Sequence, residues 1–362
     1  MFECTLVKEL ENALNELGFS GHFFDNLLNK SKFAKVKTAY INFMKAVVYT
    51  KYGSADVLQL KEVEKPAPKD NEVLIKIIAT TVNRTDCGFR KPEYLIVRLV
   101  GGLFKPKRKI LGSELAGIVE TIGKNVNTFK PGDSVFGLST FNFGTHAEYI
   151  CIPQDNSITT KPTNMSFAEA AAVCDGGFLA LANIKKIDFT KSLNILINGA
   201  SGSIGSASVQ FAKYFGANIT AVCNTKDFDL LKSLGADHVI DYTKEDFTKN
   251  GQQYDVVIDA VGKSSFFRCR KILKPKGLYF STELGYLSQN IFLALLTPLF
   301  GGKKVLFPIP KDSKEDIVFI KELMETGKYK AVIDRTYTFE QIIDATRYVE
   351  TGQKVGNVVI TI

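Results

Sequence analysis

Apolar and polar positions alternate in two different ways along the chain, and the change comes at about residue 165. Before it, apolar stretches such as EVLIKIIATTVN (72–83) and DSVFGLS (133–139) are separated by Gly, Pro and Asp, which is typical of short β-strands joined by turns. After it, apolar stretches such as SLNILIN (192–198) and YDVVIDAVG (254–262) alternate with helical stretches. That alternation predicts a parallel sheet with helices on both faces.

These patterns predict an α/β fold with two domains and a distinct N-terminal segment. The mostly β domain comprises 44–164, and the doubly wound parallel-sheet domain comprises 165–310. In residues 1–43, leucines recur at helical spacing with acids between them, which predicts one or two amphipathic helices. This segment is either an appended helical element or the result of an upstream start codon. Its five acidic residues argue against a mitochondrial transit peptide.

Composition argues against a membrane-spanning protein, a disulfide-rich protein and a nucleic-acid-binding protein. The longest apolar run, Ile291 to Phe300, is too short for the roughly 18 residues of a membrane span and contains Pro298. The six cysteines are scattered without a C-x-x-C pair, so we expect a reducing cytoplasm and no disulfide framework. The net charge is +8, but KPKRK (105–109) is the only tight basic cluster. We therefore expect no nucleic-acid partner, and a basic balance also suits an anionic small ligand.

The segment NGASGSIG (198–205) lies between a predicted buried strand and a predicted helix. Its three glycines, Gly199, Gly202 and Gly205, are spaced three residues apart. A strand that enters a helix through a tight glycine turn presents backbone N–H groups and the positive end of the helix dipole, which together bind pyrophosphate. The spacing differs from the commoner G-x-G-x-x-G, but the order of strand, turn and helix is the one that a dinucleotide site needs.

Together with FKPGDSVFG, GTHAEYICIP, YDVVIDAVG and the C-terminal stretch VIDRTYTFEQIIDATRYVETGQKVGNVVITI, this segment resembles the quinone oxidoreductase branch of the medium-chain dehydrogenase/reductase superfamily. The resemblance runs in collinear order from Met44 to Ile362. It implies a GroES-like β domain, in which 44–164 is completed by 311–362, against a Rossmann domain, with NADP(H) in the cleft between them, and a homodimer. It implies cofactor contacts at Gly199, Ala200, Ser201, Gly202, Ser203, Ile204, Gly205, Asn224, Thr225, Lys226, Tyr242, Ala260, Val261 and Asn357.

The end of the second Rossmann strand favours NADP over NAD. An acidic residue there binds the ribose hydroxyls of NAD and repels a 2′-phosphate. In NITAVCNTKDFD (218–229) the strand ends in Asn224, Thr225 and Lys226, whose amide, hydroxyl and ammonium donors suit a phosphate. Tyr242 matches a tyrosine that reaches this phosphate in the resembling enzymes.

The resemblance also assigns catalytic candidates. TTVNRTDCGFR (80–90) matches the segment that lines the nicotinamide pocket, with Asn83 to orient a carbonyl and Asp86 to order the site or relay a proton. Both residues could instead cap a turn. Tyr94 is a candidate acid. Phe141, Phe143 and residues 284–300 form either an apolar wall and lid over a flat acceptor or a dimer interface.

The pattern predicts no catalytic or structural zinc, because Ser113 stands where zinc alcohol dehydrogenases have the histidine of a GHE motif and residues 88–150 contain no cysteine. Only Glu114 and Cys174 remain as ligands, too few for an open zinc site. His146 and His238 are interpreted as structural. Without a Lewis acid, we expect activated acceptors: quinones or α,β-unsaturated carbonyls. The alternative is a dinucleotide-binding protein that has lost turnover and serves as a structural or regulatory partner.

Overall fold

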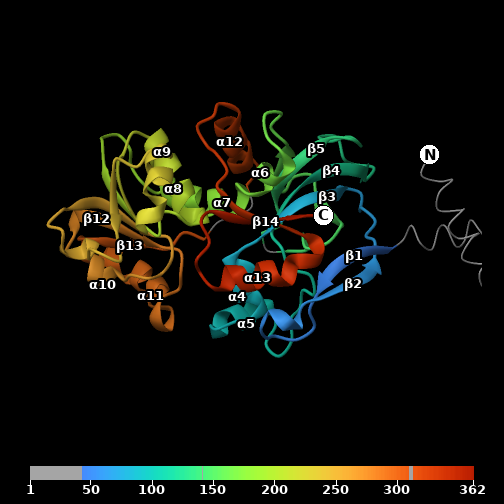
Figure 1. Cartoon of the computed structure of the whole chain (residues 1–362), viewed down its shortest axis with the longest axis horizontal. Coiled ribbons are helices and arrows are strands. Elements are labelled where there is room, and N and C mark those ends of the chain that lie inside the picture. Colours follow the sequence, from blue (N-terminus) through green and yellow to red (C-terminus); the bar gives the residue numbers. More distant parts are fainter. Residues whose placement is uncertain (1–42, 141, 310–312) are drawn as a thin grey trace, which may run out of the picture. The chain divides into compact units, whose positions relative to one another are not determined.

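The computed structural model describes residues 43–140, 142–309 and 313–362. Residues 1–42, with the helices expected there, and Phe141 lie outside the described residues. Strands β1 (Phe43–Val48) and β2 (Gln59–Glu64) lie outside the two large sheets of Figure 1. Residues 45–61 and 67–362 form one compact unit.

The first large sheet is mostly antiparallel and has the strand order β14-β15-β3-β4-β5-β7, with β6 paired to β3. Its members are β3 (Glu72–Val82), β4 (Glu114–Ile122), β5 (Ser134–Leu138), β6 (Tyr149–Pro153), β7 (Ile158–Thr160), β14 (Ile333–Thr338) and β15 (Asn357–Thr361). The C-terminal strand β15 pairs antiparallel with β3, so the end of the chain contributes to a sheet formed mainly by residues before 165.

The second large sheet is parallel throughout and has the order β10-β9-β8-β11-β12-β13. Its members are β8 (Asn194–Asn198), β9 (Asn218–Cys223), β10 (His238–Asp241), β11 (Tyr254–Asp259), β12 (Leu273–Ser281) and β13 (Lys304–Leu306). The order reverses between β8 and β11, where ligands bind in doubly wound folds. This confirms the α/β fold class with a GroES-like and a Rossmann-like part. The boundaries 44–164, 311–362 and 165–310 stay a prediction.

Successive residues of the central strand β8 pack into two different cores. Ile195 and Ile197 join the core formed with α7 (Cys174–Ile184), α8 (Ser203–Tyr214) and α9 (Phe228–Ser233). Leu196 joins the core formed with α10 (Phe266–Cys269) and α11 (Gln289–Leu296). Figure 1 shows these two groups of helices on opposite sides of the sheet. Burial on both faces explains why the strand is a continuous apolar run.

The remaining helices are α4 (Arg84–Arg90), α5 (Leu95–Gly101), α6 (Phe167–Ala171), α12 (Lys314–Glu325) and α13 (Ile342–Glu350). By length and composition, one helical stretch of the described residues, Phe167–Ile184, could cross a membrane, but 67% of it is buried inside the protein as a core helix is. Helix α10 ends at Cys269, shortly before β12 begins at Leu273 to pair with Tyr254 of β11.

Candidate functional site

The glycine turn before α8 has the geometry of a pyrophosphate site. Gly199 has φ of 74°, a left-handed conformation that favours glycine. A Cβ on Gly205 would lie 2.2 Å from the Gly199 carbonyl oxygen, so the helix could not pack this closely on the turn with any other residue. Gly202 is the N-cap of α8, and no side chain caps this end. The first helical turn therefore has its positive end available for an anion.

The C-terminal segment holds this turn in place. The Gly356 N–H donates to the Ser201 carbonyl at 2.7 Å, and the Ser203 hydroxyl donates to Asn357 Oδ1 at 2.6 Å. Asn357 also donates to the Val332 carbonyl, at 3.1 Å. These bonds join the strand β15 of the first sheet to the dinucleotide turn of the second.

The other predicted cofactor residues near the turn differ in exposure. Ala200 is fully buried and its N–H donates to the Val222 carbonyl at 3.0 Å, so this residue supports the turn from inside, while Ser201, Gly202, Ser203 and Ile204 are half-buried. Ala260 and Val261 follow β11 at the reversal point, and Val261 is 37% exposed. A Cβ on Gly199 would lie 2.3 Å from Val261 Cγ1, which shows that this valine packs directly on the turn.

The predicted 2′-phosphate residues gather where β9 and β10 end. Thr225, Lys226 and Tyr242 are exposed, and Asn224 accepts a hydrogen bond from the Lys226 N–H at 3.2 Å. The Thr225 hydroxyl is engaged, because it donates to the Asp241 carboxylate.

Two charged groups at this place were missed by the sequence reasoning. Hydrogen bonds from the Thr225 and Thr243 hydroxyls hold the pKa of Asp241 well below its ordinary value, so this carboxylate is ionised. Lys244 lies 3.0 Å from the Thr225 hydroxyl and 3.8 Å from the Asp241 carboxylate, which balances its charge. Their signal was the sequence DYTK directly after the third Rossmann strand.

Asn83 and Asp86 form the capping box that begins α4. The Asp86 N–H donates to Asn83 Oδ1 at 2.9 Å, and the Asn83 N–H donates to Asp86 Oδ2 at 3.0 Å. Asp86 Oδ1 also accepts from the Gly112 N–H at 2.9 Å. Both side chains are buried. Their hydrogen bonds hold the start of α4 and the backbone at Gly112 in place. The capping role that we considered from the sequence is thus present.

The Glu114 carboxylate is the centre of the buried network around Asn83. It accepts hydrogen bonds from the Thr81 hydroxyl, from Asn83 Nδ2 at 3.4 Å and from the Asp175 N–H at 2.7 Å. Asn83 Nδ2 also donates to the Ser113 hydroxyl at 2.9 Å. Glu114 thus connects β4 of the first sheet to the N-terminus of α7, which packs against the second sheet.

Burial raises the pKa of Glu114 to about 7, although its hydrogen-bond donors act in the opposite direction. Burial and the neighbouring Glu114 raise the pKa of Asp175 well above its ordinary value. Lys354 faces the same two carboxylates, and burial lowers its pKa. Glu114 is fully buried and Asp175 is half-buried. Because the pKa values of both carboxyl groups are raised, the pair retains a proton at neutral pH.

We expect Asp175→Asn to flatten the dependence of stability on pH. Carboxyl groups with raised pKa values in the folded protein lose their stabilising contribution as pH rises from their ordinary values through about 7. The wild type should lose about 1–3 kcal/mol of unfolding free energy between pH 5 and pH 8 through this pair, and the variant clearly less. Denaturant unfolding at both pH values measures it.

Asp188→Asn is the matched control for this change. Asp188 is exposed and its pKa is lowered by hydrogen bonds to Thr190, so its contribution is lost only at acid pH. Parallel losses of stability in wild type and Asp175→Asn between pH 5 and pH 8 would show that the pair does not share a proton.

Tyr94 and Glu283 come from the two halves of the protein, and Glu283 lies close enough for its charge to act on Tyr94. Tyr94 is the half-buried N-cap of α5, and Glu283 follows β12 at the carboxyl edge of the parallel sheet. Burial and then the charge of Glu283 raise the pKa of Tyr94. Burial is also the main cause of the raised pKa of Glu283.

Neither side chain has a hydrogen-bond or ion-pair partner among the described residues. An acid–base pair without internal partners, at the edge where ligands bind, is available to a substrate. Sequence reasoning named Tyr94 but missed Glu283, whose signal was an acidic residue directly after the strand pattern GLYFST.

The apolar wall expected at Phe143 is not formed by that residue. Phe143 is only 3% exposed and packs against Phe89 with ring centroids 4.8 Å apart. It belongs to the core that β3 and β15 form with α13. Within 284–300, by contrast, large apolar side chains are exposed.

His146 and Cys174, two of the candidate metal ligands, are buried and make other contacts, and His238 is exposed. His146 is buried, and its Nε2 lies 2.9 Å from the Thr81 carbonyl and 3.7 Å from Asp86. His238 is the exposed first residue of β10. Cys174 is fully buried, its thiol donates to the Ala170 carbonyl at 3.4 Å, and burial raises its pKa far above the ordinary value. Among the described residues, no three His, Cys, Asp or Glu side chains are arranged to hold a metal ion.

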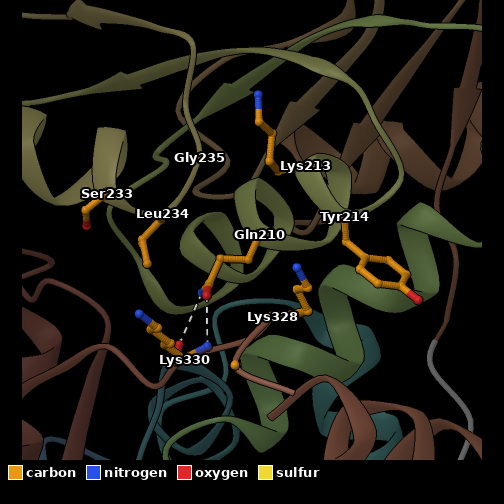
Figure 2. A pocket seen from close by; sticks show the side chains of 9 residues that line it. Gln210, Lys213, Tyr214, Ser233, Leu234, Gly235, Lys328 and Lys330 are labelled. Atoms are coloured by element: carbon orange, nitrogen blue, oxygen red, sulfur yellow. Dashed lines mark hydrogen bonds between the residues drawn. The ribbon is translucent and has the colours of Figure 1, made fainter. Parts of the chain in front are cut away.

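A separate cavity of about 480 Å³ lies between α8, the turn after α9 and the chain after α12. Figure 2 shows Gln210 between these elements, hydrogen-bonded to the backbone of Lys330. Lys213, Lys328 and Lys330 line it, and Lys213 forms an ion pair with Asp237. Lys213 lies in the last turn of α8, where a cation balances the negative end of the helix dipole.

The glycine turn at the reversal point of a parallel sheet, together with the antiparallel sheet that supplies Asn83 and Glu114, defines a nicotinamide-dependent dehydrogenase or reductase. Residues 69–163 match the family model of the alcohol dehydrogenase GroES-like domain, and residues 234–360 match the model described as zinc-binding dehydrogenase. The chain belongs to the medium-chain dehydrogenase/reductase superfamily, in its quinone oxidoreductase branch, and it is an oxidoreductase.

Two relatives and one solved structure illustrate this membership. The chain is 36% identical to a 2-methylene-furan-3-one reductase of Solanum lycopersicum, covering 88% of this chain and 79% of the relative. It is 31% identical, with the same coverage, to an NADPH-dependent alkenal/one oxidoreductase of Arabidopsis thaliana. The structure of a quinone oxidoreductase from Coxiella burnetii superposes with a TM-score of 0.80 at 25% identity, covering 88% of this chain and 99% of that one.

The expected cytoplasmic location is wrong. Relatives from Arabidopsis thaliana, Spinacia oleracea and Danio rerio are named chloroplastic or mitochondrial proteins, which points to an organellar location. Scattered cysteines without disulfides indicate only a reducing compartment, and that condition does not distinguish the cytoplasm from the interior of an organelle. Nor did the five acidic residues in 1–43 decide the compartment.

Proposed function

We propose that this oxidoreductase uses NADPH to reduce a quinone or an α,β-unsaturated carbonyl, without a zinc ion. The observation that carries the proposal is the Tyr94–Glu283 pair, which lies free of internal partners at the carboxyl edge of the sheet that bears the dinucleotide turn. The names of the relatives from Solanum lycopersicum and Arabidopsis thaliana, both reductases of such acceptors, support it.

In this proposal, one group of residues binds the cofactor and another donates the proton. When bound, the nicotinamide supplies a hydride to the acceptor. The backbone from Gly199 to Gly205 binds the pyrophosphate, and Tyr94 donates a hydrogen bond to the acceptor oxygen as negative charge collects on it. The proton that completes the reduction comes from Tyr94, which Glu283 re-protonates, directly or through water. Asn83 and Asp86 are positioning residues, because their side chains are buried in the capping box.

Preference for NADPH rests on the charges at the ends of β9 and β10. Lys226 and Lys244 provide two exposed ammonium groups, and Tyr242 provides a hydroxyl. Asp241 would oppose a phosphate, but Thr225, Thr243 and Lys244 already occupy its oxygens. The balance of free donors favours a phosphate dianion.

Independence from zinc rests on the side chains that replace its ligands. Ser113 accepts the Asn83 amide, Glu114 is saturated by three donors, and the Cys174 thiol resists ionisation because it is buried. A catalytic zinc needs three protein ligands in deprotonated form. These residues do not fit that ion.

We expect purified, untagged protein to contain well below one equivalent of zinc and to keep its reductase activity after treatment with a chelator. Elemental analysis and NADPH oxidation with an enone, before and after chelation, measure both. A stoichiometric ion, or activity that returns only with added zinc, would contradict the zinc-free proposal and the choice of activated acceptors that depends on it.

A homodimer and the domain boundaries 44–164 with 311–362 and 165–310 complete the proposal. The resemblance implies the dimer, and the pairing of β15 with β3 supports assigning the C-terminal segment to the first domain.

A further inference from the structure

The helix α5 and the loop that follows it expose an unusual number of large apolar side chains. Leu95, Leu99 and Val100 are 66%, 59% and 51% exposed, and Phe104 reaches 89%. Ile96 and Leu103 are exposed as well. Single exposed apolar residues are ordinary on protein surfaces, but a contiguous group of this kind marks a contact surface.

A second group of exposed apolar side chains lies on α11 and its flanking turns. Its members are Tyr286, Leu287, Phe292, Leu295, Leu296, Leu299 and Phe300. Leu299 and Phe300 are 77% and 81% exposed, and the helix contributes few residues to the core beneath it. The composition of the stretch is as apolar as that of a buried helix, but most of its large side chains are exposed to solvent.

The two groups lie along the same edge of the protein. Tyr94, directly before α5, lies near enough to Glu283, shortly before Tyr286, for the charge of Glu283 to act on its pKa. Figure 1 shows α5 and α11 along the same lower edge, with α12 at the opposite edge. We call the two groups together the α5–α11 face.

Positive charge borders the α5–α11 face. Lys105, Lys107 and Lys109 follow Phe104 directly and are exposed, and no ion pair with another described residue engages them. Arg108 belongs to the same cluster, and Lys303 and Lys304 follow Phe300. Each apolar group is therefore followed in sequence by basic residues.

We propose that the α5–α11 face docks the protein on an anionic lipid bilayer. Apolar side chains that enter the boundary between headgroups and acyl chains, flanked by Lys and Arg that contact anionic headgroups, are the features of an interfacial membrane anchor. The face borders Tyr94 and Glu283, so the docked protein would present its site to acceptors dissolved in the membrane. The docking itself does not depend on the proposed reaction.

A second copy of this chain fits the face less well. A two-fold symmetric contact pairs a surface with itself, so the basic clusters of the two copies would meet across or beside the same interface. Like charges in an interface oppose association, whereas an anionic bilayer complements them.

Co-sedimentation with vesicles tests the proposal. We expect the full-length protein, without cofactor or substrate, to bind vesicles of phosphatidylcholine mixed with phosphatidylserine, to bind phosphatidylcholine alone far more weakly, and to be released by salt. The triple change Lys105→Glu, Lys107→Glu and Lys109→Glu should weaken binding by about 100-fold or more. The double change Leu99→Ser and Phe104→Ser should weaken it at least about tenfold.

Each change has a matched control on another part of the surface. Lys130→Glu, Lys328→Glu and Lys330→Glu alter the net charge by the same amount, and Leu60→Ser with Val318→Ser removes two other exposed apolar side chains. Both controls should bind vesicles as the wild type does. The α5 variants should keep the thermal unfolding and the activity of the wild type with a water-soluble acceptor.

Failure of the wild type to bind the anionic vesicles would overturn the proposal, whatever the variants do. Equal loss of binding in the charge-matched control would overturn it too, because net charge alone would then explain the binding. A wild-type dimer by light scattering that becomes a monomer on Leu99→Ser with Phe104→Ser, without vesicle binding, would assign the face to a second copy. Because vesicle binding is measured without turnover, its failure is distinguishable from failure of the proposed reaction.

Discussion

Tyr94→Phe is expected to lower kcat for the reduction of an α,β-unsaturated carbonyl by about 10²–10⁴-fold, the usual contribution of a positioned general acid. The phenylalanine ring keeps the N-cap position of α5 and its packing but removes the hydroxyl that donates to the acceptor oxygen. The dissociation constant of NADPH should not change, because the hydroxyl acts on the acceptor. Steady-state kinetics with an enone, together with a fluorescence titration of NADPH, measure both quantities.

Tyr286→Phe is the matched control, since this tyrosine is 79% exposed and lies on the neighbouring turn. It should leave kcat within about twofold of the wild type. If Tyr94→Phe retained full turnover, the proton would have to come from another group, and the assignment of the Tyr94–Glu283 pair would be wrong.

The second large effect concerns the coenzyme. NADPH is expected to bind at least about ten times more tightly than NADH, because charge-assisted hydrogen bonds contribute about 1.5–3 kcal/mol each. The double variant Lys226→Ala with Lys244→Ala should raise the dissociation constant of NADPH by about 10–100-fold and leave that of NADH almost unchanged. The lower part of the energy range applies because both lysines are exposed.

Lys249→Ala serves as the control for this pair, since its side chain is 81% exposed and its charge lies beyond the end of β10. It should alter neither dissociation constant. Equal affinity of the wild type for NADPH and NADH would contradict the assignment of the phosphate pocket. So would an equal loss for both coenzymes in the double variant, which would show that the lysines act on the shared part of the dinucleotide.

Local patterns made the two-sheet fold predictable from the sequence. The apolar run around Ile195 and Ile197 predicted a strand buried on both faces, and NGASGSIG predicted the turn that opens α8. Both are local signals, because the periodicity of side chains and the conformational freedom of glycine act within a few residues. The placement of the chain end in the first domain came instead from the family resemblance, and the domain boundaries stay a prediction, although β15 does pair with β3.

Features that depend on contacts between distant residues were not predictable in the same way. Glu283 lies near Tyr94 only because β12 brings it to the edge that α5 borders, and a single acidic residue after a strand carries no such information. Asp241 and Lys244 likewise meet Thr225 only through the parallel pairing of β9 and β10. The part of Glu114 in the site was also missed, since its donors come from three separate segments.

The most direct test of the central claim is to follow NADPH oxidation, in protein freed of metal by a chelator, with a panel that pairs activated acceptors against plain ones. The panel contains a quinone, an enone with its saturated ketone, and an enal with its saturated aldehyde. We expect turnover with the quinone, the enone and the enal, reduction of the carbon–carbon double bond in the last two, and little turnover with the saturated partners. Tight binding of NADPH without oxidation by any member of the panel would contradict the claim and would favour a dinucleotide-binding protein that has lost turnover.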